Sequence, residues 1–142
     1  MTTDYYLAFL KAHQPMPGDA DVTDDEASVF AAALKYFEAQ PDVRCIPLLI
    51  NSVSQDTGLG IYEHIKFTLM AHPRDAVLPH LERGLRSEQL GVVYRCCWWS
   101  ADFDAWEFAP LVRSVMTHSD EDVHGAATAF LELADERAPG PG

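Results

Sequence analysis

The fold of this chain is predicted from three similar segments: Ile46-Pro47-Leu48-Leu49, Leu78-Pro79-His80-Leu81 and Ala109-Pro110-Leu111-Val112. Their prolines, at positions 47, 79 and 110, lie 32 and 31 residues apart. One helical turn beyond each segment stands another apolar residue, at Val53, Leu85 and Met116. A period of this length is typical of proteins that stack pairs of helices. Each segment is therefore expected to form the first helix of a pair.

A second amphipathic stretch follows the later two prolines, at residues 88–101 and 119–136. An offset of 31 residues aligns Val92 with Val123 and Trp99 with Phe130, so these side chains are expected to face the core. Trp98 is rotated by roughly 100° from its neighbour and is expected to be partly exposed. Eight side chains are predicted to be buried: Leu49, Val53, Leu81, Leu85, Val92, Trp99, Val123 and Phe130.

Local signals mark two helices before the first of these segments. Residues 3–13 are expected to form a helix that ends at the prolines and glycine of residues 15–18. Thr23 followed by Glu26 is the pattern of a capping box, and it predicts a second helix that ends before Pro41.

Further caps and breaks complete the plan. Asp42 is expected to cap the next helix, and Ser87 and Ser119 the second helices of the last two pairs. Residues 56–60 are expected to form a loop and residues 61–71 a helix. The chain is thus predicted to be all-α, a short irregular α-solenoid of eight helices in about four antiparallel pairs.

The segments around Asp42-Val43-Arg44, Leu78-Pro79 and Pro110, the last with residues 119–127, resemble HEAT-type repeats. The resemblance covers about residues 43–136, and the first helix pair is similar only in layout. It implies a curved superhelix whose second helices line one concave face. His124 and Val93 replace the arginine usual after the valine of the second helix, which predicts an irregular stack.

Size and charge narrow the classes of partner. With 142 residues, the chain is expected to form one HEAT-like domain at residues 1–137, followed by a flexible Pro/Gly tail at 138–142. It has 22 acidic and 10 basic residues, a formal charge of −12. Nucleic acid and anionic membranes call for a basic surface, so neither is an expected partner, whereas a basic protein is.

The compartment is inferred from what the sequence does not contain. No apolar stretch reaches the roughly 20 residues of a membrane span. The N-terminal segment carries Asp4 and no basic region of a secretory signal. The chain has three cysteines, Cys45, Cys96 and Cys97, which is an odd number, and their spacing is not that of a disulfide framework. They are therefore expected to be reduced thiols of a cytoplasmic protein.

We expect no metal, no cofactor and no catalytic residue. The six histidines lack the spacing of three or four that a helical metal site requires, and the best remaining pair is His80 with Glu82 or Glu63. Cys96 and Cys97 fall in an apolar helix, where loss of solvation raises the pKa of a thiol. Gly58-Leu59-Gly60 precedes a helix but follows no strand, so a turn is favoured over an anion site.

Acidic residues gather at the two ends of the chain. Residues 101–142 hold nine acidic and two basic residues, residues 1–40 hold seven and two, and the middle is neutral. Exposed carboxylates speed association with a basic protein, and tryptophan and tyrosine carry much of the energy of interfaces. The candidate partner-binding residues are Asp56, Tyr62, Trp98, Asp102, Asp104, Trp106 and Glu107.

Residues 48–53 and 58–63 resemble stretches of small bacterial HEAT-like proteins associated with toxin immunity. This resemblance implies a non-catalytic protein that neutralises a basic toxin domain by occupying its active site. The alternative is a HEAT-like accessory protein, of the lyase or maturation type, that acts on a small molecule or a protein. The sequence does not distinguish a plain scaffold subunit from the non-catalytic binding protein.

Overall fold

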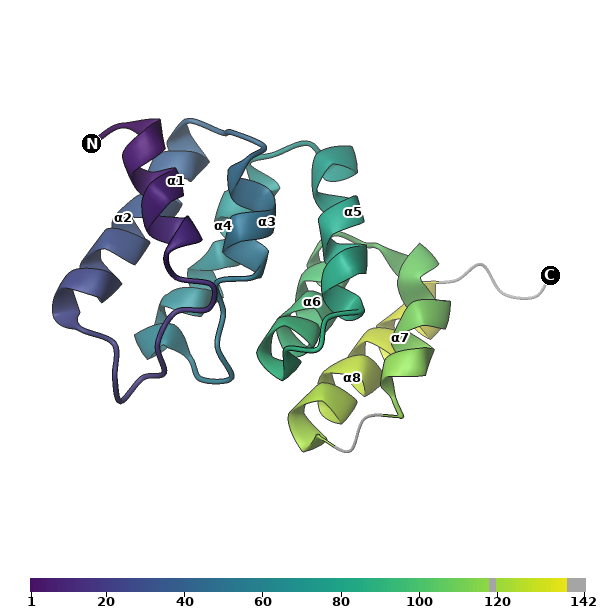
Figure 1. The fold of residues 1–142 in the computed structure, drawn as a ribbon. Helices are drawn as coiled ribbons and strands as arrows, with labels where there is room; N and C mark the ends of the chain where they lie inside the picture. The colour runs from purple at the N-terminus through teal and green to yellow at the C-terminus, as the bar shows by residue number, and fades with distance from the viewer. Residues whose placement is uncertain (118–119, 138–142) are drawn as a thin grey trace. The chain divides into compact units, whose positions relative to one another are not determined.

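All regular secondary structure in the part of the chain that the structure describes is helical. The computed structural model describes residues 1–117 and 120–137, and within these ranges it contains eight α-helices, two short 3₁₀ helices and no strand (Figure 1). The prediction of an all-α chain with eight helices is confirmed. The expected cap at Ser119 and the expected tail at 138–142 lie outside the described residues.

The elements follow one another along the chain, and the longest connection is residues 12–23, between α1 and α2. They are α1 (Thr3–Lys11), α2 (Asp24–Ala39), α3 (Cys45–Ile50), η1 (Gly58–His64), α4 (Ile65–Met70), α5 (Arg74–Leu85), α6 (Leu90–Asp102), η2 (Trp106–Phe108), α7 (Ala109–Val115) and α8 (Glu121–Arg137). The chain divides into two compact units, an N-terminal unit (Met1–His80) and a C-terminal unit (Leu81–Gly142), with the boundary inside α5. The single domain expected at residues 1–137 stays a prediction.

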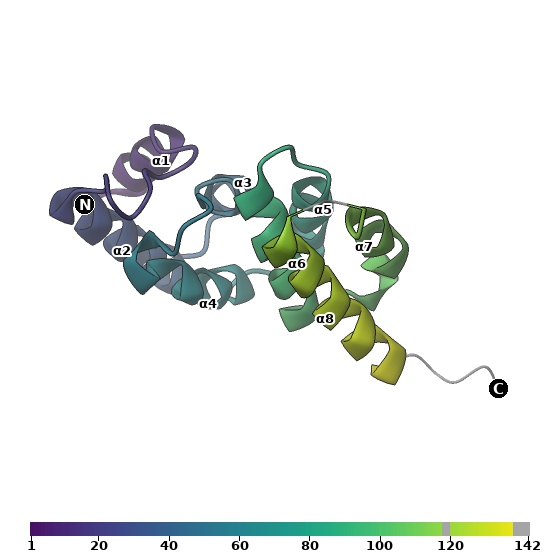
Figure 2. The same ribbon diagram turned by 90° about the horizontal axis from the view of Figure 1, so that it is seen from below.

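In the N-terminal unit, alternate helices pack on one another. α1 contacts α3 and α2 contacts α4, while α1 also packs on α2. Figure 2 shows α1 and α3 in one layer of this unit and α2 and α4 in the other. The largest fully buried side chains come from both layers, among them Leu10, Phe30, Phe37, Leu49 and Leu69.

A single carboxylate joins the end of α1 to the start of α2. Thr23 Oγ1 accepts the Glu26 N–H at 3.1 Å, and Glu26 Oε1 accepts the Thr23 N–H at 3.0 Å, which is the predicted capping box. The second oxygen, Oε2, lies 2.9 Å from Nε2 of His13, just beyond α1. The hydrogen bond from Thr23, followed by that from His13, lowers the pKa of Glu26.

Asp42 organises the turn before α3. Its Oδ1 accepts the Arg44 backbone N–H at 3.0 Å, and its Oδ2 pairs with the Arg44 guanidinium at 2.7 Å. The expectation that Asp42 caps the helix is wrong, because these bonds form a turn ahead of α3 and Arg44, the residue before the helix, makes no side-chain cap bond. These bonds to Arg44 lower the pKa of Asp42 from 3.8 to about 2. The helix itself begins three residues later, at Cys45.

In the C-terminal unit, α8 packs against both α6 and α7. The eight side chains predicted to be buried, in both units, are all at most 3% exposed. Asp120 caps α8, because its Oδ1 accepts the Val123 N–H at 3.0 Å.

Two further expectations about helix starts are wrong. Ser87 accepts the Gln89 N–H at 3.0 Å and so forms a turn ahead of α6, which begins at Leu90 rather than at residue 88. The helix expected over residues 61–71 is divided, and α4 begins only at Ile65, after the 3₁₀ helix η1. Pro79 stands inside α5, whereas Pro110 stands near the beginning of α7. A proline inside a helix removes one backbone donor, and Pro79 therefore leaves the Asp75 carbonyl without its usual partner.

The two adjacent tryptophans of α6 provide a matched test of the core. Trp99 is 3% exposed and Trp98 is 39% exposed, as the alignment predicted. Trp99→Ala is expected to cost about 3–5 kcal/mol of unfolding free energy because it leaves a cavity, and Trp98→Ala about 2 kcal/mol less. Urea unfolding of the two variants measures the difference. Equal losses would contradict the assigned core.

Asp42 is expected to make the protein acid-sensitive. Because the pKa of Asp42 is lowered to about 2, its contribution to stability is present above pH 3.8 and is lost as the pH falls toward 2. The contribution at pH 7 is below about 1 kcal/mol, since the pair with Arg44 is largely solvated. Urea midpoints of wild type and Asp42→Asn should therefore differ at pH 7 and converge near pH 2. Asp21→Asn, at a carboxylate without a described hydrogen bond, is the control.

Candidate functional site

The carboxylates predicted to bind a partner lie in one short loop of the C-terminal unit. Asp102 is the last residue of α6, Asp104 follows with a left-handed backbone (φ +52°), and Glu107 lies in η2. All three side chains are exposed. The loop thus presents three carboxylates within six residues.

Trp106 attaches this loop to α8. Its ring lies 5.2 Å from the Phe130 ring, and the Arg137 guanidinium lies 5.6 Å from the Trp106 centroid. Arg137 Nη1 also approaches Asp104 Oδ1 at 3.6 Å. The indole is half-buried, so one part of it holds the loop in place while another part faces solvent.

Trp98 lies one helical turn before Asp102 on α6, and the two therefore share a face of that helix. Both are exposed. We define the acidic surface as Trp98, Asp102, Asp104, Trp106 and Glu107. It holds five of the seven residues that the sequence analysis nominated.

The other two nominated residues lie in the N-terminal unit and have local structural roles. Tyr62 is 1% exposed, and its hydroxyl oxygen accepts the Ser54 N–H at 3.1 Å. The expectation that Tyr62 presents a ring to a partner is therefore wrong. Asp56 is exposed, but its carboxylate accepts the Asp19 N–H at 2.9 Å.

The glycine loop before α4 is a turn, as expected, and its donors are already occupied. Gly58, Leu59 and Gly60 all have left-handed backbone conformations, with φ of +59°, +54° and +86°. The Asp19 carboxylate accepts the N–H groups of Thr57 and Leu59 at 3.3 and 3.2 Å, and the Thr57 hydroxyl at 2.6 Å. The Thr57 hydroxyl contributes most to lowering the pKa of Asp19. The chain's own carboxylate thus fills the place of an external anion.

All three thiols are buried. Loss of solvation raises the pKa of Cys45 and of Cys97 to about 12, and raises that of Cys96 as well. The prediction of raised pKa values for Cys96 and Cys97 is confirmed.

The sequence analysis missed a pairing of Cys45 with His72, which are 27 residues apart. Cys45 Sγ lies 3.6 Å from Nε2 of His72, and this nitrogen also accepts the Asp42 N–H at 3.1 Å. The other ring nitrogen lies 2.9 Å from the Thr68 carbonyl oxygen. A cysteine beside a histidine is the arrangement that activates a nucleophile. Here burial opposes ionisation of the thiol, and the imidazole joins the end of α4 to the turn before α3.

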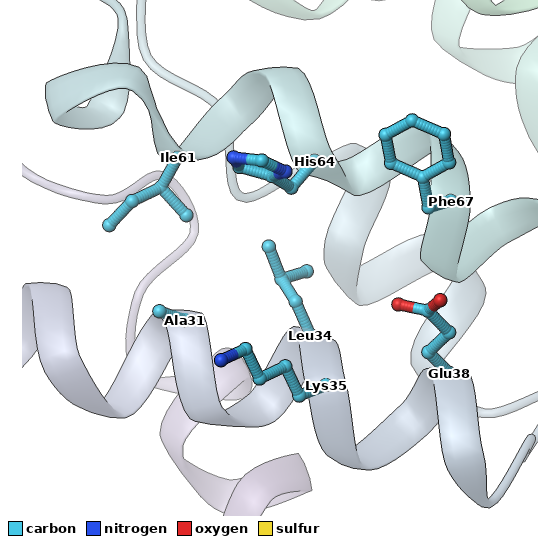
Figure 3. A pocket seen from close by; sticks show the side chains of 7 residues that line it. All are labelled: Ala31, Leu34, Lys35, Glu38, Ile61, His64 and Phe67. Atoms are coloured by element: carbon cyan, nitrogen blue, oxygen red, sulfur yellow. The ribbon is translucent and has the colours of Figure 1, made fainter.

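A pocket of about 420 Å³ lies in the N-terminal unit between α2 and the segment η1–α4 (Figure 3). Its lining residues are Ala31, Leu34, Lys35 and Glu38 from α2, and Ile61, His64 and Phe67 from η1 and α4. Its volume falls within the range of small-molecule sites. The sequence analysis nominated none of these residues. The sequence does hold a signal for this pocket. The lining residues of α2 lie three, four and seven positions after Ala31, and those of η1–α4 are spaced by three, so each set falls on one helical face.

Within residues 1–117 and 120–137, no group of three or more His, Cys, Asp or Glu side chains is arranged to hold a metal ion. None of the described helices is long and apolar enough to cross a membrane. Comparison of the chain with protein-family models, with curated proteins and with solved structures gave no match.

The buried thiols are expected to be inert in the folded protein. At pH 8 a thiol with a pKa of about 12 is ionised in about 1 molecule in 10,000, and only the thiolate reacts readily. With 5,5′-dithiobis(2-nitrobenzoate), native protein should release no chromophore within minutes, while protein in 6 M guanidinium should release three equivalents. Rapid reaction of one thiol in the native protein would contradict the prediction, because it would mean that this thiol is exposed by opening of the structure or is activated by its neighbours.

Proposed function

We propose that the chain is a non-catalytic protein-binding module whose acidic surface binds a basic protein, in the manner of a bacterial immunity or antitoxin-type protein. The observation that carries the proposal is the loop of residues 102–107, in which three exposed carboxylates surround a half-exposed indole. Complementary charge accelerates association, and an aromatic anchor slows dissociation.

Helix stability does not account for the acidic residues around this loop. Glu132, Asp135 and Glu136 stand near the C-terminal end of α8, where the helix dipole disfavours negative charge. Arg137 contacts both Asp104 and Trp106, which brings this end of α8 to the acidic surface. Negative charge concentrated at a cost to the helix supports a role in recognition.

A solenoid arrangement of the four helix pairs is part of the same proposal. Its support is the proline period in the sequence and the packing of alternate helices, α1 on α3 and α2 on α4 in the N-terminal unit and α6 on α8 in the C-terminal unit. A HEAT-like stack would build its layers from such contacts. The cytoplasm remains the proposed location, because it matches the three unpaired thiols.

Charge substitution in the acidic surface tests the binding proposal. We choose Asp102→Lys with Asp104→Asn, because asparagine tolerates the left-handed backbone at position 104. The partner is first captured from the native lysate by a pull-down with the wild-type chain. It should then associate about tenfold more slowly with this variant at low salt, and the rate should depend less on salt. Trp98→Ala should instead speed dissociation. Stopped-flow or surface-based kinetics at two salt concentrations measures both effects.

A matched control carries the same change of net charge elsewhere. Asp21→Asn with Glu88→Lys alters two exposed acidic residues outside the acidic surface. This control should bind like wild type, and thermal melts should show both double variants folded. Equal kinetics for the two double variants, or a partner that is itself acidic, would contradict the proposal.

A growth assay separates immunity from a general scaffold role. The captured partner, expressed alone, is expected to arrest bacterial growth, and co-expression of this chain should restore it. The Asp102→Lys/Asp104→Asn variant should restore growth less well than the Asp21→Asn/Glu88→Lys control. If the captured partner does not arrest growth, the immunity role is contradicted, and the binding role still stands.

A further inference from the structure

We propose that the pocket between α2 and η1–α4 binds a small amphipathic anion, a carboxylic acid with a flat apolar body. This site lies in the N-terminal unit and is independent of the acidic surface, so each proposal stands or fails alone. The inference combines three features of the pocket: its volume, its apolar walls and the position of its one ammonium group.

The walls suit an apolar body. Ala31 and Leu34 of α2 face Ile61 and Phe67 across the pocket (Figure 3). Phe67 is 49% exposed, an unusual state for so large an apolar side chain. A flat ring placed between Leu34 and Phe67 would remove apolar surface from water on both of its faces.

The polar groups of the pocket favour an anion at one end. Lys35 is one of only two basic residues among the first 40, and it forms no ion pair within the described part of the chain. Figure 3 shows its ammonium directed toward Ala31 and away from Glu38. His64 stands on the opposite wall of the pocket. A carboxylate is the group that pairs best with an ammonium.

Glu38 determines the direction in which such a ligand lies. Its carboxylate is beside Phe67, at the end opposite the Lys35 ammonium (Figure 3). The Lys66 ammonium also lies at this end, 5.2 Å from the Phe67 ring centroid, so the Phe67 end holds a carboxylate and an ammonium together. Among the described lining residues, Lys35 is the only charged one at the other end, so the acid of the ligand belongs near Lys35 and the apolar body near Phe67. Because the chain is strongly acidic overall, binding of the acid group near Lys35 depends on the local charge there and not on the net charge of the chain.

Two probes that differ only in charge test the proposal. 2-Naphthoate and its neutral analogue 2-naphthamide are titrated into the full-length protein at fixed ionic strength, with ¹H–¹⁵N shifts as the readout. We expect saturable shifts centred on residues 31–38 and 58–67, and about tenfold tighter binding of the acid than of the amide.

Four variants separate charge from shape. Lys35→Met should reduce the affinity for 2-naphthoate about tenfold and leave that for the amide unchanged, whereas Lys11→Met, on α1, should change neither. Glu38→Gln should raise the affinity for the acid about twofold by removing a like charge. Ala31→Met should weaken both probes by filling the pocket.

Several outcomes would overturn the proposal. These are equal binding of acid and amide, unchanged binding of the acid by Lys35→Met, saturation at residues away from the pocket, and no saturation by 10 mM of either probe. Lys35 is exposed, so its loss leaves the fold intact, and the spectrum of each free variant verifies this.

Discussion

The contact between Gly58 and the Tyr62 ring determines how the N-terminal unit is built around its pocket. Gly58 has a left-handed backbone, and a Cβ at this position would overlap the ring. Only glycine meets both demands. The ring is also fixed at its far end, where the Tyr62 oxygen accepts the Ser54 N–H. Because η1 starts from this fixed point, Ile61 and His64 face α2 and form one wall of the pocket.

Carboxylates serve two purposes in this chain, and their surroundings distinguish them. Asp19, Glu26 and Asp42 each accept backbone N–H groups, which favours the charged form and lowers their pKa values. These three stabilise turns and helix starts. The carboxylates of the acidic surface lie in and beside a loop that the Trp106 indole fixes to α8, and their side chains are exposed, including Asp104, which also pairs with Arg137. A composition count treats both kinds alike, whereas only the second kind is suited to recognition.

Periodicity predicted the parts of the fold that repeat along the chain. It distinguished Trp99 from Trp98, and the Thr23 capping box needed only residues within one helical turn. Periodicity failed for Tyr62. Its burial depends on the absence of a side chain at Gly58 and on contact with Phe30, a residue far away in the sequence whose ring centroid lies 6.0 Å from that of Tyr62. The same reason hid the Cys45–His72 pair and the pocket. Each is formed by residues from two elements whose approach is set by packing, and no local pattern records that approach.

The two proposed sites impose opposite demands on the electrostatic field of one acidic chain. A formal charge of −12 attracts a basic protein from a distance, and added salt screens that attraction. The same charge repels a small anion on its way to the pocket, so added salt removes an obstacle there. Close to the pocket, the Lys35 ammonium acts over a few ångströms and is screened far less. Ionic strength should therefore shift occupancy from the acidic surface toward the pocket. If net charge alone decided, both sites would prefer a positively charged ligand. The position of Lys35 among apolar walls allows the pocket to take an anion while the acidic surface takes a cationic protein.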